Sequence, residues 1–183
     1  MTALLLAPHS DDETLFASFL ILRYRPHVVT CFRSHVQEAR GGPTFATREQ
    51  ETQKATRHLG FPDLEQLPVR DDAPDPEMLA ALLTEIEGRE RWDVVFAPAV
   101  EDGGHDQHNL VGELALQVFG AERVTTYLTY RRGHGKSQSL SPIPYEPSWV
   151  SAKLRAMAEY ESQIELGNCR YWFTEAPLLE WYA

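Results

Sequence analysis

The stretch LLLAPHSDDE, which runs from Leu4 to Glu13, decides how this chain folds. Its apolar first half is continuous rather than alternating, as is typical of a central strand of a parallel sheet that is buried on both faces. A proline ends the run, and a helical pattern follows from about Asp12 to Tyr24. A strand, a turn and a helix in this order leave the polar residues on the turn, at the sheet edge where open α/β folds bind ligands.

The rest of the chain repeats the alternation of apolar strand and helix. Further strands are expected at His27 to Phe32, Leu64 to Val69, Asp93 to Pro98 and Arg123 to Tyr130. Further helices are expected at Ala46 to Leu59, at Pro76 to Gly88, after a loop at Val100 to Asn109 as far as Phe119, and at Trp149 to Leu166. This order predicts an α/β fold of Rossmann-like, three-layer α/β/α architecture with a mostly parallel central sheet. No Gly-x-Gly-x-x-Gly fingerprint follows the first strand, which disfavours a dinucleotide-binding dehydrogenase.

The length of 183 residues predicts one domain that spans residues 1–183. Two long irregular stretches stand out, the polar connection from Arg33 to Thr44 and a stretch near 131–148 that is rich in Gly, Ser and Pro. Such long connections are often functional or mobile, so the second is expected to be a flexible loop or lid. A C-terminal helix near 149–166 is expected to follow it.

Composition and charge exclude several classes of protein. The net charge of −10 disfavours nucleic-acid partners and anionic membrane surfaces. No apolar run approaches the roughly 18 residues of a membrane span, and the start of the chain lacks the pattern of a signal peptide. The two cysteines, Cys31 and Cys169, do not indicate a disulfide framework. These features predict a cytoplasmic protein with no membrane span and no nucleic-acid partner, and they leave a homo-oligomer open.

Two short polar clusters carry the candidate chemistry. One is HSDDE at residues 9–13 and the other is GGHDQHN at residues 103–109, and each follows an apolar strand that ends in Ala-Pro. If both strands are parallel, both clusters lie at the same edge of the sheet and can converge. Each cluster also holds two candidate ligands three positions apart, a spacing that brings side chains to one side of a turn that enters a helix.

Imidazole and carboxylate groups of this kind suit zinc, which in catalytic sites takes three protein ligands and a water. Each cluster also has a plainer interpretation. Asp11-Asp12 alone is typical of a helix N-cap that favours the helix dipole, and a single His-x-x-His is often only a polar surface feature. The occurrence of both clusters after two matched strands favours a metal site.

The two clusters together resemble the motifs of the PIG-L/LmbE-like family of zinc-dependent N-acetylglucosamine de-N-acetylases. Pro8 to Glu13 is similar to the family's Ala-His-Pro-Asp-Asp-Glu run, with serine in place of proline at Ser10. His105 to His108 is similar to its His-Pro-Asp-His run, with Asp-Gln in place of Pro-Asp. Neither difference touches a candidate ligand. Two further stretches also look like the family: Arg48 to Glu51, and Lys153 with Tyr160 to Gln163.

The resemblance implies zinc, or another divalent first-row metal, held by His9, Asp12 and His108. It also implies that Asp11 is the general base, which takes a proton from water and passes it to the leaving amine. His105 is then the candidate donor to the oxyanion of the attacked carbonyl, with a hydrogen bond that supports a ligand as the alternative.

The resemblance implies a hydrolase that removes an N-acetyl group from an N-acetylglucosamine-type amino sugar or its conjugate. Arg48 is a candidate contact to a sugar hydroxyl or phosphate, or it pairs with a neighbouring glutamate. Asp71 is a candidate contact to sugar hydroxyls or a solvated loop charge, and His134 is a candidate for the substrate entrance. Two alternatives stay open: a metal-dependent hydrolase of another amide or ester, and a carbohydrate-binding protein without turnover. The intact motifs argue against the second.

Overall fold

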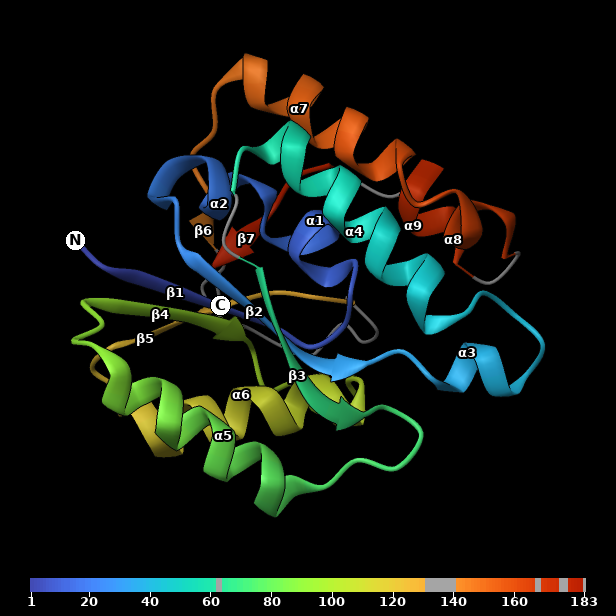
Figure 1. The fold of residues 1–183 in the computed structure, drawn as a ribbon. Coiled ribbons are helices and arrows are strands. Elements are labelled where there is room, and N and C mark those ends of the chain that lie inside the picture. Colours follow the sequence, from blue (N-terminus) through green and yellow to red (C-terminus); the bar gives the residue numbers. More distant parts are fainter. Residues whose placement is uncertain (62–63, 131–140, 167–168, 175–177, 183) are drawn as a thin grey trace.

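The structure, a computed structural model, describes residues 1–61, 64–130, 141–166, 169–174 and 178–182 (Figure 1). Within these ranges one sheet has the strand order β3-β2-β1-β4-β5-β7-β6. The strands are β1 (Ala3–Ala7), β2 (His27–Arg33), β3 (Leu64–Arg70), β4 (Val94–Pro98), β5 (Val124–Tyr127), β6 (Ser141–Pro142) and β7 (Trp181–Tyr182). Strands β1 to β5 pair in parallel, and β7 pairs antiparallel with β5 and β6. The predicted α/β fold with a mostly parallel sheet is confirmed.

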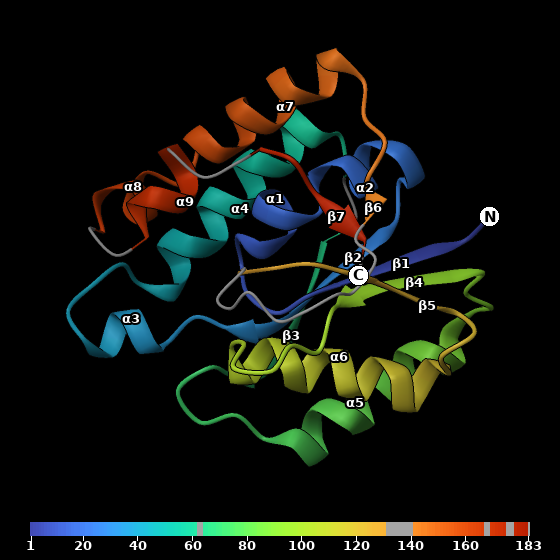
Figure 2. The same ribbon diagram turned by 180° about the vertical axis from the view of Figure 1, so that it is seen from behind.

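Helices cover both faces of this sheet (Figures 1 and 2). The described helices are α1 (Asp12–Phe16), α2 (Ser18–Tyr24), α3 (Val36–Ala39), α4 (Phe45–Leu59), α5 (Pro76–Arg89), α6 (Asp106–Phe119), α7 (Pro147–Ala158), α8 (Glu161–Glu165) and α9 (Arg170–Thr174). Helices α1, α2, α4 and α7 pack on one face, and α5 and α6 pack on the other. Three layers result, as the alternation of strands and helices predicts.

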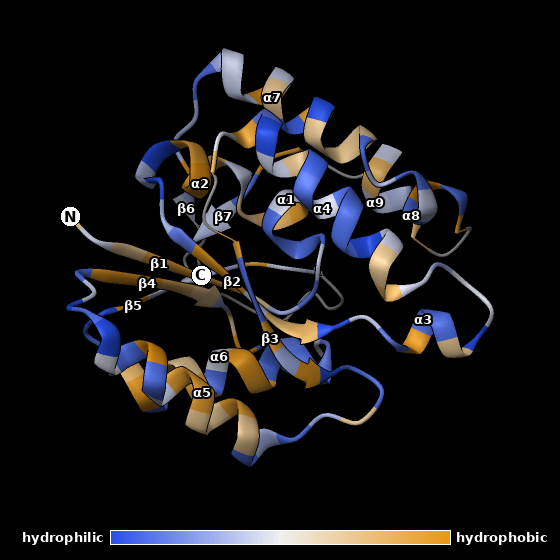
Figure 3. Cartoon of the chain, in the orientation of Figure 1, coloured by the Kyte–Doolittle hydropathy of each residue, from blue (hydrophilic) through white to orange (hydrophobic). Residues whose placement is uncertain are grey.

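The central strand β1 shows why its sequence is apolar without alternation. Leu5 packs into the core beneath α1, α2, α4 and α7, whereas Leu4 and Leu6 pack into the core beneath α5 and α6. All three leucines are fully buried. In Figure 3, β1 and β4 are mostly apolar, while the visible side of α4 is largely polar. A strand covered on both faces needs apolar side chains in both directions.

Two predicted helices are interrupted in the structure. The helix expected from Asp12 to Tyr24 breaks at Ala17, whose φ of −134° and ψ of 14° are not helical. The helix expected from Trp149 to Leu166 is divided into α7 and α8 between Ala158 and Glu161. Neither break contains a glycine or proline, so the local sequence gives no warning of it.

Two expected loops contain regular structure. The polar connection after β2 includes the short helix α3. Helix α6 begins at Asp106, earlier than expected, so His108 lies in its first turn. Of the expected flexible loop near 131–148, residues 131–140 lie outside the described residues, Ser141–Pro142 form β6, and α7 begins at Pro147.

The strand order reverses beside β1, because β2 and β3 lie on one side of it and β4 and β5 on the other. This switch point brings the turn after β1 and the loop after β4 together at the carboxyl edge of the sheet. Gly112 lets α6 approach the end of β4 closely, since a Cβ at this position would lie 2.4 Å from the carbonyl oxygen of Pro98. The close approach fixes the helix turn that carries His108.

Candidate metal and active site

Three predicted ligands meet at the switch point. His9 lies on the turn after β1, Asp12 begins α1, and His108 lies in the first turn of α6. Asp12 Oδ2 is 3.0 Å from His9 Nδ1 and 3.1 Å from His108 Nε2, and these two nitrogens are 3.3 Å apart. His108 and Asp12 are almost fully buried, and His9 is half-buried. The three side chains form a group that could hold a metal ion.

The outer nitrogen of each imidazole has its own partner. His9 Nε2 lies 2.6 Å from Gln107 Oε1, and His108 Nδ1 lies 2.9 Å from Thr129 Oγ1. An amide oxygen can only accept, so His9 donates from Nε2. The partners therefore orient both rings with His9 Nδ1 and His108 Nε2 toward Asp12, as ligating histidines are oriented in metal sites.

The charges of this group favour a cation. Burial acts to lower the pKa of His9, but hydrogen bonds and charge attraction from Asp12, with a further contact from Gln107, outweigh it and raise the pKa to about 9. Burial acts to raise the pKa of Asp12, and the two histidines instead hold it well below its usual range. Among the described residues, Asp12 Oδ1 is buried without a hydrogen-bond partner. A buried carboxylate oxygen without a partner is costly, and a metal ion would satisfy it.

Asp11 stands beside this group and is held by Arg48. Arg48 Nη2 donates to Asp11 Oδ2 and to the carbonyl oxygen of Ser10, both at 2.8 Å. Arg48 projects from α4 and is 2% exposed, and Asp11 is 7% exposed. The expected pairing of Arg48 with a glutamate is weaker, since Nη1 lies 4.0 Å from Glu51 Oε2. Asp11 takes the N-cap position of α1, but its side chain makes no capping hydrogen bond, so the N-cap interpretation does not account for it.

His105 is the N-cap residue of α6, and its Nδ1 accepts a hydrogen bond from the Gln107 backbone N–H at 3.3 Å. A neutral imidazole that accepts at Nδ1 carries its proton on Nε2. Its ring centroid lies 5.3 Å from that of His9 and 4.8 Å from that of His108. His105 thus lies beside the three-residue group.

A cavity of about 220 Å³ lies beside this site, and His9, Asp11 and His105 contribute to its lining. Its lining is His9, Asp11, Ser34, Val36, Gln37, Arg40, Arg48, Asp71, His105, Gln107, Tyr130, Gln163 and Cys169. Of the predicted substrate contacts, Arg48 and Asp71 therefore line the cavity, and His134 lies outside the described residues. Asp71 Oδ1 also accepts hydrogen bonds from the backbone N–H groups of His35 and Val36, at the start of α3.

Glu13, next to the group, is fully buried and points elsewhere. Its carboxylate accepts hydrogen bonds from the hydroxyls of Tyr160 and Thr14. Burial raises the pKa of Glu13 to about 7, although Tyr160 acts to lower it. These contacts tie the start of α1 to the segment between α7 and α8.

Two residues that support the group are not among the predicted site residues. Neither motif difference replaces a candidate ligand, but one of them introduces Gln107, which contacts His9 and also donates from Nε2 to the carbonyl oxygen of Asp71 at 2.6 Å. Thr129, just after β5, contacts His108. Its place near the carboxyl end of the strand expected at Arg123 to Tyr130 is a signal that could have found it.

The fold and the site together define an α/β protein with a His-Asp-His group that could hold a metal ion at the switch point of its sheet. The family model described as PIG-L, GlcNAc-PI de-N-acetylase, matches residues 4–119 of the chain. The matched part includes both motifs and all three members of the group. The chain belongs to the PIG-L family.

Solved structures share the fold at low sequence identity. A deacetylase of the teicoplanin biosynthetic pathway is 17% identical with a TM-score of 0.74, over 100% of this chain and 97% of that one. A further structure, of the zinc-inhibited form of teicoplanin deacetylase, is 17% identical with a TM-score of 0.72, over 92% and 86% of the two chains. The N,N′-diacetylchitobiose deacetylase of Pyrococcus horikoshii is 20% identical with a TM-score of 0.69, over 93% and 73%.

The fold also occurs with another activity. GalB of Pseudomonas putida, a 4-carboxy-2-hydroxymuconate hydratase, is 18% identical with a TM-score of 0.65, over 95% of this chain and 83% of that one. No curated protein matches the sequence. Among the described residues, no helix has the length and apolar character needed to cross a membrane.

Proposed function

We propose that this protein is a zinc-dependent hydrolase that removes the acetyl group from an N-acetylglucosamine-type amino sugar or its conjugate. The observation that carries the proposal is the convergence of His9, Asp12 and His108 beside the Arg48-bound carboxylate of Asp11, within the part of the chain that matches the PIG-L family. His9, Asp11 and Arg48 line a cavity whose polar lining suits a hydroxylated substrate.

His9 Nδ1, an oxygen of Asp12 and His108 Nε2 would hold the zinc ion. Two nitrogens and one carboxylate oxygen form a donor set that zinc accepts in catalytic sites. Zinc held there supplies a Lewis acid that makes water nucleophilic near neutral pH and polarises an amide carbonyl. Gln107 and Thr129 keep the two rings in the orientation that presents these nitrogens.

Asp11 acts as the general base in this proposal. Arg48 engages Asp11 Oδ2 and leaves the other carboxylate oxygen to accept a proton from the attacking water. The same carboxyl group then passes this proton to the amine that leaves. Arg48 is a positioning residue in this scheme, since it holds the base and the Ser10 carbonyl in one place.

His105 is the proposed donor to the oxyanion. Its ring lies beside the three-residue group, where it would stabilise the negative charge that forms on the attacked carbonyl oxygen. Asp71 and Arg48, which line the cavity, are proposed contacts to the sugar, and His134 is a third proposed contact.

Acetate release from a substrate panel tests the proposal. The panel contains N-acetylglucosamine, its methyl glycoside, its 1-phosphate and N,N′-diacetylchitobiose. Asp11→Asn is expected to lower kcat by about 10²- to 10⁴-fold while it retains the metal. His9→Ala and His108→Ala are expected to lose the metal, and His27→Ala, whose ring contacts Glu65 on another part of the sheet, is the control that keeps it.

The panel also separates the two alternatives. The GalB likeness means that the fold alone does not fix the reaction. A hydrolase of another amide or ester would bind metal and depend on Asp11 but release no acetate from the panel. A carbohydrate-binding protein without turnover would bind a panel sugar but release no acetate. In that case Asp11→Asn would change only the affinity for the sugar.

The metal itself is tested by titration of the metal-free protein. About one equivalent of zinc per chain should restore activity after removal by a chelator. The related teicoplanin deacetylase has a zinc-inhibited form, so zinc beyond one equivalent is added as a separate arm of the titration. Cobalt and iron(II) are compared in parallel, because such ligand sets also accept other first-row metals.

A further inference from the structure

Helix α1 is short, and two proposed site residues, Asp11 and Asp12, lie at its start. It has five residues, it begins with Asp12, and it follows Asp11 directly. An isolated helix of this length is unstable in water, so α1 depends on its contacts with the rest of the protein. Its last residue, Phe16, is followed by the non-helical Ala17, and α2 then starts at Ser18.

A buried ion pair occupies the break between α1 and α2. In a continuous helix the N–H of Phe19 would donate to the carbonyl oxygen of Leu15, four residues earlier. Instead, Lys153 Nζ donates to Leu15 O at 2.7 Å, and Phe19 N–H donates to Glu180 Oε2 at 2.8 Å. Lys153 and Glu180 contact each other at 2.7 Å. The ion pair is thus inserted into the path of one helical hydrogen bond.

Side chains also replace the helical hydrogen bond one residue earlier. In a continuous helix the N–H of Ser18 would donate to the carbonyl oxygen of Thr14. Here the Ser18 hydroxyl donates to that oxygen at 2.7 Å, and Glu180 accepts from the Ser18 backbone. Side chains therefore satisfy the backbone groups that the break exposes, and the break is a built feature of the fold.

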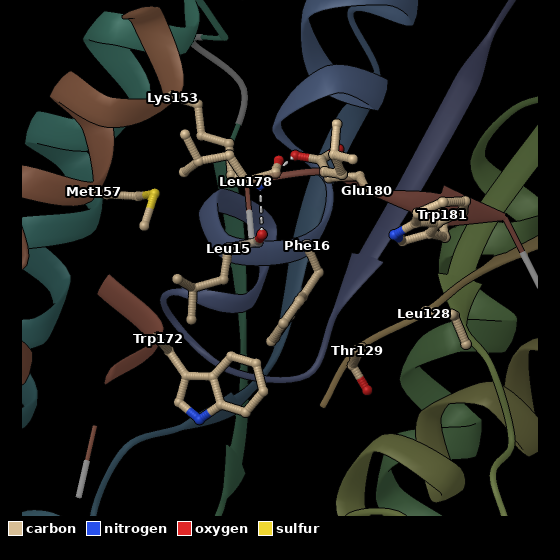
Figure 4. A pocket seen from close by; sticks show the side chains of 11 residues that line it. Leu15, Phe16, Leu128, Thr129, Lys153, Met157, Trp172, Leu178, Glu180 and Trp181 are labelled. Atoms are coloured by element: carbon tan, nitrogen blue, oxygen red, sulfur yellow. Dashed lines mark hydrogen bonds and ion pairs between the residues drawn. The ribbon is translucent and has the colours of Figure 1, made fainter. Parts of the chain in front are cut away.

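The ion pair is buried, and removal of two charges from water costs free energy. Lys153 is 1% exposed and Glu180 is 3% exposed. Burial raises the pKa of Glu180 although Lys153 acts to lower it. Both side chains lie at one wall of a cavity of about 120 Å³ that is otherwise largely apolar, as Figure 4 shows with Leu15 and Phe16 below them. Buried pairs of this kind are often no better for stability than apolar residues of similar volume, so stability is a weak reason for its presence.

We propose that Lys153 and Glu180 are positioning residues that hold the helix open at Ala17 and thereby fix the direction in which α1 presents Asp11 and Asp12. Asp12 lies five residues before Ala17, which corresponds to about 7.5 Å along the helix axis at about 1.5 Å per residue. A change in the bend would move Asp12 relative to His108, which belongs to α6 on the opposite face of the sheet. The inference rests on the metal site proposed above.

The test replaces both charges together with Lys153→Met/Glu180→Leu, so that no buried charge is left without its partner. Three quantities are measured: the melting temperature, the dissociation constant for Zn²⁺ by competition with a chelator, and the crystal structure of the variant. The expected result is a folded protein with Zn²⁺ affinity lowered by at least about tenfold, the usual cost of lost support around a ligand. Wild-type Zn²⁺ affinity in the folded variant would overturn the proposal.

Met157→Ala is the matched control. Met157 lies one helical turn after Lys153, is buried, and lines the same cavity, but it makes no hydrogen bond at the break. It should lower the melting temperature while Zn²⁺ affinity stays within about twofold, because the ligands keep their support. If Met157→Ala weakens Zn²⁺ binding as much as the double variant does, loss of stability explains both and the positioning role is wrong.

Two other results remain informative: a double variant that does not fold, and a wild-type protein that binds no Zn²⁺. If the double variant does not fold, Ser18→Ala removes a single hydrogen bond across the break and should weaken Zn²⁺ binding by about twofold to tenfold; no change would overturn the proposal. If the wild-type protein binds no Zn²⁺, the proposed function fails. The crystal structure of the double variant then decides the inference: a Phe19 N–H to Leu15 O hydrogen bond supports it, and a retained break at Ala17 overturns it.

Discussion

Arg48 and Asp11 are joined inside the protein, where Nη2 of the guanidinium donates to Oδ2 of the carboxylate at 2.8 Å. The same nitrogen donates to the carbonyl oxygen of Ser10 at 2.8 Å. One side chain from α4 therefore fixes both the backbone and the side chain of the turn that carries the proposed base. It also supplies a positive charge to a carboxylate that is nearly removed from water.

Arg48→Lys tests whether this geometry matters for turnover. An ammonium group lacks the planar fork of a guanidinium and has a shorter reach, so it will not hold Asp11 as Arg48 does. We expect kcat to fall by about 10- to 100-fold, as misplacement of a reacting group by about 1 Å can cost. Bound metal, measured by elemental analysis, should not change. Arg57→Lys, an exposed position on the same helix, is the control, and full activity in Arg48→Lys would refute the role.

Gln107→Ala tests the support of His9. The substitution removes the acceptor of the His9 Nε2 proton and the donor to the Asp71 carbonyl oxygen. The ring then loses its fixed orientation, and Zn²⁺ affinity should fall by about 10- to 100-fold. Gln117→Ala, at an exposed position on the same helix, should leave affinity unchanged. Equal affinities in the two variants would show that His9 needs no such partner.

The two polar clusters could be predicted because their signal is local, whereas the choice of His9, Asp12 and His108 within them is what the family resemblance implies. His9 and Asp12 follow one apolar strand directly, and His108 follows another, so strand patterns and spacing place all three at one sheet edge. The order of helices and strands was predictable for the same reason, because each element carries its own apolar period.

The remaining features depend on contacts between distant segments. The break lies at Ala17 although alanine is the strongest helix former, and the groups that hold it open come from Lys153 and Glu180. Likewise, Arg48 was expected near the site, but its choice of Asp11 over Glu51 follows from how α4 packs against the turn. Local sequence patterns carry no information on such pairings, since tertiary packing decides them.

Glu65 gives a test of pH-dependent stability away from the site. Burial acts to raise the pKa of Glu65, but the contacts with Arg89 at 2.6 Å and His27 at 3.2 Å outweigh it and lower the pKa. A carboxylate with a lowered pKa stabilises the fold above its ordinary pKa of 4.5, and this contribution is lost as the pH falls through the lowered value.

The melting temperature of Glu65→Gln should therefore be lower than that of the wild type at pH 7, and the two should converge as the pH falls from about 5 to 3. The pair is partly exposed, so the difference should be at most about 3 °C, from a contribution of up to about 1 kcal/mol. Glu113→Gln, an exposed change on α6, is the control. A difference that grows toward acid pH would contradict the sign.

Thr129→Val tests the support of His108. Valine has nearly the shape of threonine but offers no oxygen to His108 Nδ1, which now lies 2.9 Å from the hydroxyl. Without that partner the imidazole proton can move to Nε2, the nitrogen that faces Asp12, and the ring can no longer ligate there. Zn²⁺ affinity should fall by about 10- to 100-fold in Thr129→Val and stay within a few-fold of wild type in Thr129→Ser, which keeps the hydroxyl. If both variants bind Zn²⁺ equally well, His108 is held by packing alone and the hydroxyl plays no part.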